Sequence, residues 1–162
     1  MKITINQAHY KASFMSSKIA EIPKPPFKSA FEAEQAFYLA FVRRDTELMA
    51  KVWANTQSVY CLHPGSQPLV GKDAIMQSWQ EIFNGPQTSQ LKIEHHNLAS
   101  DPKLSVHRIT EHLTIQGEGE NIRQATIHAM NIFQCINDNW YIISHHTAPA
   151  PQIATPKGET VH

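Results

Sequence analysis

The spacing of apolar and polar positions divides the chain into a helical half and a strand-rich half. Between residues 29 and 84, apolar side chains recur every three or four positions, the spacing of one helix face. A first helix is expected after the capping box Ser29-Ala-Phe-Glu32, and Asp45 can cap a short second helix. The clearest periodicity lies in KDAIMQSWQEIF, which Asn84-Gly85-Pro86 ends. The pattern predicts three helices, with one early strand, SVYCLHP, between the second and the third.

After residue 87 the periodicity changes to that of strands. QLKIEHHNLAS alternates at its start, LSVHRITEHLTI and IRQATIHAMNIFQCI are long and β-branched, and WYIISHHT is the last apolar run. Turn residues separate these runs at Asp101-Pro102, in QGEGEN and at Asn137-Asp138-Asn139. Three helices, an early strand and a four-strand meander predict an α+β domain with helices on one face of a curved antiparallel sheet.

Proline-rich segments suggest where the domain begins and ends. Residues 1–28 close with Pro23-Lys-Pro-Pro26, which cannot continue a helix, and are expected to form a flexible N-terminal extension. Residues 149–162 are polar and interrupted by prolines, as in a loose C-terminal tail. The folded domain is therefore expected to span residues 29–148.

Composition narrows the classes of function. Lys and Arg together number 14, as do Asp and Glu, so no net charge favours binding to nucleic acid or to an anionic membrane. No apolar run approaches the roughly 18 residues of a membrane span, and residues 1–28 lack the pattern of a signal peptide. Cys61 and Cys135 lie far apart and are expected to be reduced. We therefore expect a cytoplasmic protein without a membrane or nucleic-acid partner.

Two stretches resemble the NTF2-like superfamily, in its SnoaL-like (polyketide-cyclase-like, ketosteroid-isomerase-like) branch. They are VYCLHPGSQPLVGKDAIMQSWQEIF and AMNIFQCINDNWYIISHHTAP, and the resemblance covers roughly residues 29–149. It implies a cystatin-like cone in which three N-terminal helices pack on a curved antiparallel β-sheet and enclose a pocket. Many members of this family dimerise through the sheet. Some are isomerases, dehydratases or cyclases, and others only bind a ligand or act as scaffolds, so the fold alone leaves the activity open.

The last hairpin suggests which side chains enter the cone, because a strand alternates its side chains between two faces. A two-residue turn at Asn137-Asp138 would place Phe133 opposite Ile142 and Asn131 opposite Ser144. His146, opposite Ala129, would then face the pocket, and its neighbour His145 would face outward. The outer face, expected to be the homodimer surface, would carry His128, Met130, Ile132, Tyr141, Ile143 and His145.

Other strands and helices supply further candidates. In LSVHRITEHLTI, His107 and Glu111 share the more apolar face, but about 13 Å of strand separates them, so neither can contact the other directly. His63, at the end of the early strand, is expected near the cone mouth. The predicted catalytic residues are His146, Glu111 and His63. The predicted ligand-binding residues are Trp53, Trp79, Phe83, His107, Asn131, Phe133 and Ser144.

Two interpretations of these residues stay open. In the first, His146 exchanges protons with a carbonyl or hydroxylated ring compound, since an imidazole titrates near neutral pH. In the second, the histidines are structural and the domain only binds a ligand or dimerises. The isomerase relatives use a carboxylate base, and YCLHP offers none on the early strand. Adjacent histidine pairs such as His145-His146 have the wrong spacing for one metal, so neither a metal nor another cofactor is expected.

Overall fold

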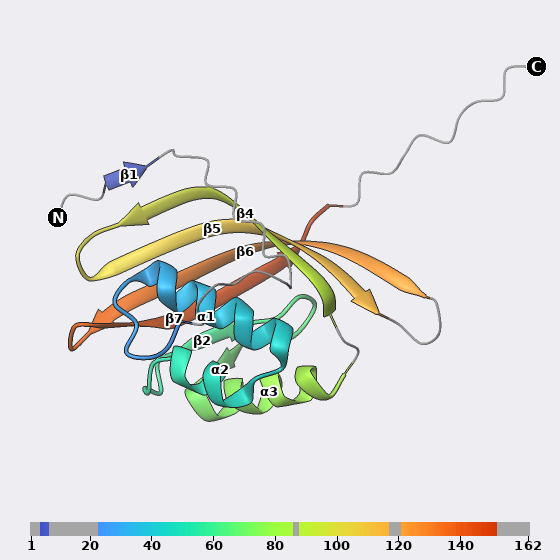
Figure 1. Ribbon diagram of the computed structural model, residues 1–162, viewed down its shortest axis with the longest axis horizontal. Helices are drawn as coiled ribbons and strands as arrows, with labels where there is room; N and C mark the ends of the chain where they lie inside the picture. Colours follow the sequence, from blue (N-terminus) through green and yellow to red (C-terminus); the bar gives the residue numbers. More distant parts are fainter. Residues whose placement is uncertain (1–3, 7–22, 86–87, 117–120, 152–162) are drawn as a thin grey trace, which may run out of the picture.

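Three helices lie on one side of a long, curved sheet in the computed structural model (Figure 1). The structure describes residues 4–6, 23–85, 88–116 and 121–151. The helices are α1 (Ala30–Arg43), α2 (Thr46–Val52) and α3 (Lys72–Asn84). The strands are β1 (Thr4–Asn6), β2 (Tyr60–Leu62), β3 (Leu69–Val70), β4 (Thr88–Ser100), β5 (Leu104–Gln116), β6 (Ile122–Ile136) and β7 (Asn139–Pro149). The predicted α+β class is confirmed.

The predicted helix caps position the helices that cover the sheet. Ser29 Oγ accepts a hydrogen bond from the Glu32 amide at 3.1 Å, and α1 begins there. Asp45 Oδ1 accepts from the Leu48 amide at 2.9 Å at the start of α2. Such caps satisfy amides that have no partner within the helix. Both caps lie where the sequence predicted them.

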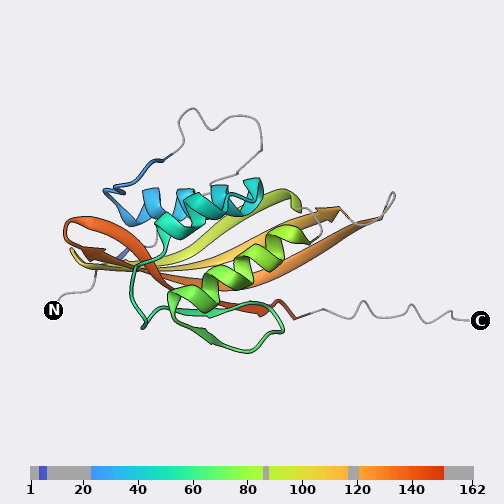
Figure 2. The same cartoon turned by 90° about the horizontal axis from the view of Figure 1, so that it is seen from below.

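The sheet has the order β1-β4-β5-β6-β7-β2-β3. Strands β4 to β7 form the predicted antiparallel meander, with continuous pairing between neighbours. The early strand β2 pairs with β7 in parallel, with Tyr60 opposite Ser144. The sheet is therefore mixed, and the expectation of a purely antiparallel sheet is wrong at this edge. Figure 2 shows the β2–β3 hairpin beside α3, at the end of the sheet away from β4.

The folded unit begins before residue 29. Phe27 is fully buried in the core, and its carbonyl accepts a hydrogen bond from the Trp140 amide at 2.9 Å. Further upstream, β1 pairs with β4, with Ile5 opposite Ala99. The expected extension, residues 1–28, thus contributes a core side chain and an edge strand, while residues 1–3 and 7–22 of it lie outside the described residues.

The C-terminal boundary also shifts. Strand β7 includes Pro149, and the Ala150 amide donates to the Thr126 carbonyl at 2.9 Å, so the ordered hydrogen bonding extends past residue 148. The remainder of the expected tail, residues 152–162, lies outside the described residues.

A β-bulge in β7 decides which histidine enters the cone. The predicted turn is present, with φ of 50° at Asn137 and 61° at Asp138, and Phe133 pairs with Ile142 as expected. The next pair is Ile132 with Ser144, so Ile143 is an extra residue in β7. A bulge of this kind reverses the alternation beyond it. The inward side chain is therefore the next residue along, His145.

Candidate functional site

A chain of four buried polar side chains crosses the cone from α1 to β7. Tyr38 Oη donates to Glu111 Oε1 at 2.7 Å and accepts from Asn131 Nδ2 at 2.9 Å. His145 Nδ1 lies 2.6 Å from Asn131 Oδ1, which can only accept, so the proton of this bond sits on His145 Nδ1. All four residues are at most 6% exposed. We call this chain the tyrosine network.

Burial sets the protonation of the tyrosine network. Burial raises the pKa of Glu111 to about 7; the nearby charge of Glu34 adds to this rise, and the hydrogen bond from Tyr38 opposes it. Burial lowers the pKa of His145 to about 3, and the charges of His63 and His146 add to this effect. Near neutral pH His145 is therefore neutral, and Glu111 is the group of the network that can gain or lose a proton.

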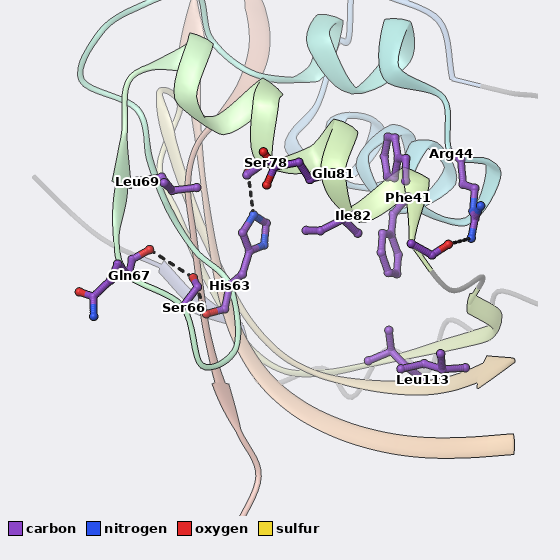
Figure 3. Close-up of a pocket in the computed structure, with 13 residues that line it drawn as sticks. Phe41, Arg44, His63, Ser66, Gln67, Leu69, Ser78, Glu81, Ile82 and Leu113 are labelled. Atoms are coloured by element: carbon purple, nitrogen blue, oxygen red, sulfur yellow. Dashed lines mark hydrogen bonds between the residues drawn. The ribbon is translucent and has the colours of Figure 1, made fainter. Parts of the chain in front are cut away.

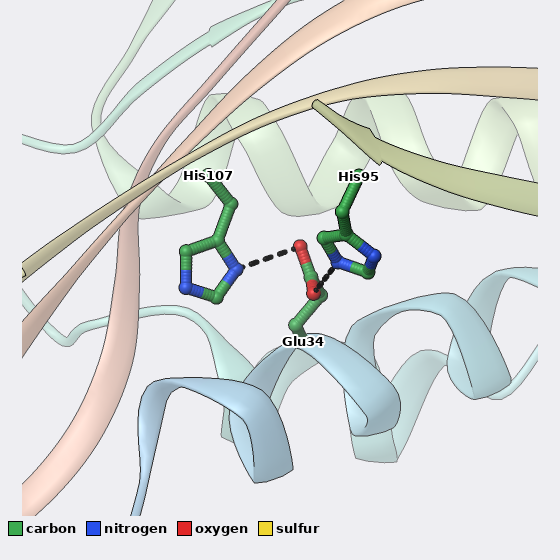
Figure 4. Close-up of side chains that lie close together, drawn as sticks. All are labelled: Glu34, His95 and His107. Atoms are coloured by element: carbon green, nitrogen blue, oxygen red, sulfur yellow. Dashed lines mark hydrogen bonds and ion pairs between the residues drawn. The ribbon is translucent and has the colours of Figure 1, made fainter. Parts of the chain in front are cut away.

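A second buried cluster lies between α1 and strands β4 and β5 (Figure 4). Glu34 Oε2 is 2.7 Å from His95 Nε2, and Glu34 Oε1 is 3.0 Å from His107 Nδ1. The other nitrogen of His107 is 2.9 Å from Ser105 Oγ. Burial by itself raises the pKa of Glu34, but the close contacts and charges of His107 and His95 outweigh it and lower the pKa to about 2. Glu34 is therefore ionised in the interior. We call Glu34, His95 and His107 the glutamate cluster.

An open pocket of about 710 Å³ lies beside the cone, between α1, α3, β5 and the β2–β3 loop (Figure 3). Most of its wall is apolar, and His63 is the one titratable ring among the residues that line it. The lining residues are Phe41, Arg44, His63, Ser66, Gln67, Leu69, Ser78, Glu81, Ile82, Phe83, Gly85, Leu113 and Ile115. This size and polarity suit a small molecule.

His63 is held in one orientation on the pocket wall. Ser78 Oγ donates its only proton to the Ile75 carbonyl at 2.7 Å, so it accepts from His63 Nε2 at 2.9 Å. A neutral His63 then carries its proton on Nε2 and a lone pair on Nδ1. Burial lowers the pKa of His63, which favours this neutral form. Figure 3 shows the second ring nitrogen on the side of Ile82.

Trp79 packs against both the pocket histidine and the tyrosine network. Its ring centroid lies 4.7 Å from that of His63 and 6.0 Å from that of His145. The rings of His63 and His145 are themselves 6.4 Å apart. Trp79 is 4% exposed and does not line the pocket. The three rings thus contact one another, and His63 connects the pocket wall to His145 of the tyrosine network.

The structure distributes most of the predicted site residues over the pocket, the two buried clusters and the core. His63 and Phe83 line the pocket, and Glu111 and Asn131 belong to the tyrosine network. His107 belongs to the glutamate cluster. The predicted ligand-binding residues Trp53, Trp79 and Phe133 are instead buried core.

Two of the predicted pocket residues do not face the cone. His146 is exposed and its ring stacks on Tyr60, with centroids 6.0 Å apart. Ser144 pairs with Ile132 beyond the bulge, and the pocket does not include it. The predicted placements of His146 inside and of His145 on the dimer face are therefore wrong, because the extra residue in β7 exchanges the two faces.

Three buried polar side chains of these two clusters were not predicted: Glu34, Tyr38 and His95. Glu34 and Tyr38 are one helical turn apart, so they lie on one face of α1. A carboxylate between Phe31 and Tyr38 on an apolar stripe was a signal available in the sequence. His95 is followed by a register shift between β4 and β5, which strand alternation alone does not reveal.

The family assignment rests on sequence as well as on shape. A model of the SnoaL-like domain matches residues 32–151. The chain belongs to the SnoaL-like family. The solved structures it resembles include a Thiobacillus denitrificans protein named for the calcium/calmodulin-dependent protein kinase type II association domain. That match has 29% identity and a TM-score of 0.71, and covers 79% of this chain and all of the other.

The chain is also similar to a solved bacterial structure and to a plant protein. A Streptomyces avermitilis protein, named as a dehydratase of the NTF2-like family, is 25% identical with a TM-score of 0.64, covering 74% of this SnoaL-like chain and 92% of that one. The F-box protein SKIP8 of Arabidopsis thaliana is 23% identical over 112 residues, or 69% of this chain. This chain spans 46% of that protein's length. Among the described residues, no helix combines the length and hydrophobicity required to cross a membrane.

Proposed function

We propose that this SnoaL-like chain binds a small, largely apolar or cyclic molecule in the pocket and exchanges a proton with it through His63. The observation that carries the proposal is one oriented, neutral imidazole on the wall of an otherwise mostly apolar cavity. The lone pair on His63 Nδ1, whose nearest recorded polar contact is the Cys61 thiol at 4.0 Å, makes the imidazole a general base at neutral pH, and its conjugate acid can return the proton. This chemistry suits reactions of the isomerase, dehydratase or cyclase type.

The pocket offers polar groups at both ends. Arg44 Nη2 donates to the Gly85 carbonyl at 2.6 Å, and Figure 3 shows Arg44 at the end of the pocket opposite His63. A guanidinium has five N–H donors, so Arg44 retains donors for a ligand oxygen. We propose that a carbonyl or carboxylate oxygen of the ligand lies near Arg44 while an apolar ring contacts Phe41 and Ile82.

Deuterium exchange tests the catalytic step directly. A panel of cyclic ketones and enones is first screened for binding by native mass spectrometry. Ligands that bind are then incubated with the protein in D₂O, and exchange at carbon next to the carbonyl is followed by NMR. We expect His63→Gln to slow exchange by about 100-fold or more while binding changes only a few-fold. His112→Gln, at a histidine 40% exposed and outside the pocket, is the matched control and should leave the rate unchanged.

The alternative is a non-catalytic binding or dimerisation module, and the exchange experiment separates the two. Binding without exchange in the unaltered protein supports the alternative, as does exchange that persists in His63→Gln. The tyrosine network favours this alternative in one respect: its polar groups satisfy one another without a ligand.

The outer sheet face supports a homodimer. Met130 is 39% exposed there, and the half-buried Ile132 and Tyr141 lie on the same strands. With the bulge taken into account, the proposed surface comprises His128, Met130, Ile132, Tyr141, Ile143 and His146. We propose that the protein dimerises through this face in the cytoplasm. Light scattering at micromolar concentration tests the assembly, and a monomer contradicts it.

A further inference from the structure

We propose that the glutamate cluster is a binding site for a divalent transition-metal ion of the zinc class. Two imidazoles and one carboxylate are ligands that such ions accept. One ligand atom from each of Glu34, His95 and His107 lies within 4.8 Å of the others, and all three residues are buried. This site is separate from the pocket, whose lining includes none of the three.

The alignment of Glu34 and His107 is the observation that points to an ion. Glu34 Oε1 and His107 Nδ1 are buried and only 3.0 Å apart, yet neither has a partner with hydrogen-bond geometry. Their approach is close, but they do not point at one another as donor and acceptor. With metal–ligand distances of about 2.1 Å, two ligands lie about 3.4 Å apart in a tetrahedral site and about 3.0 Å apart at right angles. The pair therefore has the separation of two neighbouring ligands of one ion.

The surroundings of His107 fix the nitrogen that it presents. Its Nε2 lies 2.9 Å from Ser105 Oγ, which orients the ring so that Nδ1 faces Glu34. Metal-binding histidines characteristically use their second nitrogen in this way, in a hydrogen bond that sets the ring's orientation. Ser105 is itself buried, so this support is not open to solvent.

Charge also favours a cation at this position. Burying an ionised carboxylate is costly unless an opposite charge accompanies it. The ion pairs of Glu34 among the described residues are those with His95 and His107. A divalent ion between the three side chains would supply the positive charge and leave both imidazoles neutral. A proton shared with one histidine is the competing explanation.

The ion can reach the site with small side-chain movements. Phe31 is 42% exposed, and its ring lies 4.9 Å from that of His107 and 5.9 Å from that of His95. One aromatic side chain therefore separates the imidazoles from solvent. The three ligand atoms already lie within 4.8 Å of one another, and a tetrahedral site with bonds of about 2.1 Å separates its ligands by about 3.4 Å.

Metal titration tests the proposal. The full chain is stripped with a chelator and titrated with Zn²⁺ and, separately, with Co²⁺, whose visible absorption reports its ligands. We expect one ion per chain, a dissociation constant at or below the micromolar range, and a melting temperature raised by several degrees. Glu34→Gln and His107→Gln should each weaken binding by about 100-fold or more. Mg²⁺ should produce no comparable effect, because it prefers oxygen ligands.

A surface pair provides the matched control. His112 and Glu94 lie 3.6 Å apart with side chains 40% and 41% exposed, so they contain the same groups without the burial. Glu94→Gln with His112→Gln should leave stoichiometry and affinity unchanged. The proposal is overturned if the unaltered chain binds less than one equivalent, or if this control loses the ion while Glu34→Gln retains it.

Spectra of the unaltered protein keep the test decisive even if a cluster variant fails to fold. Imidazole nitrogen NMR during a Zn²⁺ titration should move the signals of His95 and His107 first and leave that of His112 in place. Shifts confined to exposed histidines, such as His146, would place the ion elsewhere and reject the glutamate cluster as its site.

Discussion

Two carboxylates buried in the same cone have opposite pKa shifts. Glu34 has a pKa lowered to about 2, whereas the pKa of Glu111 is raised to about 7. Both side chains are at most 6% exposed, so burial raises the pKa of each. The difference lies in their neighbours. Glu34 faces two imidazoles, which can carry positive charge, and Glu111 faces the neutral phenol of Tyr38.

The comparison assigns the two carboxylates different chemistry. A permanently ionised group between histidines is suited to holding a cation, as we propose for Glu34. A group with a pKa near 7 gains and loses a proton near neutral pH, as Glu111 does. Partner chemistry, more than depth, therefore decides what a buried carboxylate can do in this cone.

The largest expected effect is a difference in stability between substitutions of the two carboxylates. Glu34→Gln removes the charge facing two histidines and should lower the free energy of unfolding at pH 7 by about 3 kcal/mol or more. Glu111→Gln should not lower it, because the neutral amide can still accept from Tyr38 and leaves no carboxylate to ionise in the core at pH 7. Urea unfolding with a chelator present measures both. Equal losses would show that the neighbours do not distinguish the two sites.

The next effect is a dependence of stability on pH. The pKa of Glu111 is about 7 in the folded protein against an ordinary 4.5, so the folded state holds more protons than the unfolded state in that interval. Stability contributed by this group therefore falls as pH rises from 4.5 through 7, by at most about 3 kcal/mol. Urea unfolding of the unaltered chain and of Glu111→Gln between pH 4.5 and 8 isolates this slope as their difference.

His145 provides the opposite slope. Its pKa falls from 6.5 to about 3 on folding, so the unfolded state binds the extra proton, and stability rises with pH between those values. Glu111→Gln should therefore leave a curve that rises to about pH 6.5 and then levels, whereas His145→Gln should leave the falling part. A Glu111→Gln curve parallel to that of the unaltered chain would refute the raised pKa.

Local patterns were sufficient for most of the fold. The caps at Ser29 and Asp45, the turn at Asn137-Asp138 and the meander each depend on residues close in the sequence. Strand alternation also placed His107 and Glu111 correctly on one inward face of β5. These features could be predicted because neighbours along the chain determine them.

The site depended on contacts that alternation does not encode. One extra residue at Ile143 exchanged His145 and His146 between faces, and no turn or glycine marks it in the sequence. The partners of His107 and Glu111 came from α1, a helix from which the sequence had supplied no candidate residue. Contacts between elements far apart in the sequence determine such sites. The alternation within each strand therefore predicted candidate residues but not their partners.

The smallest expected effect concerns the link between Tyr38 and Glu111. Tyr38→Phe removes a hydrogen bond of 2.7 Å to Glu111 and the acceptor of Asn131 Nδ2, and should lower the free energy of unfolding by about 1 to 2 kcal/mol. Because that bond lowers the pKa of Glu111, its loss should move the pKa above 7. Carbon NMR of the glutamate carboxyls measures the titration. The control is Tyr141→Phe, because the Tyr141 hydroxyl makes no hydrogen bond among the described residues. An unchanged or lower pKa of Glu111 in Tyr38→Phe would mean that the phenol does not stabilise the ionised carboxylate.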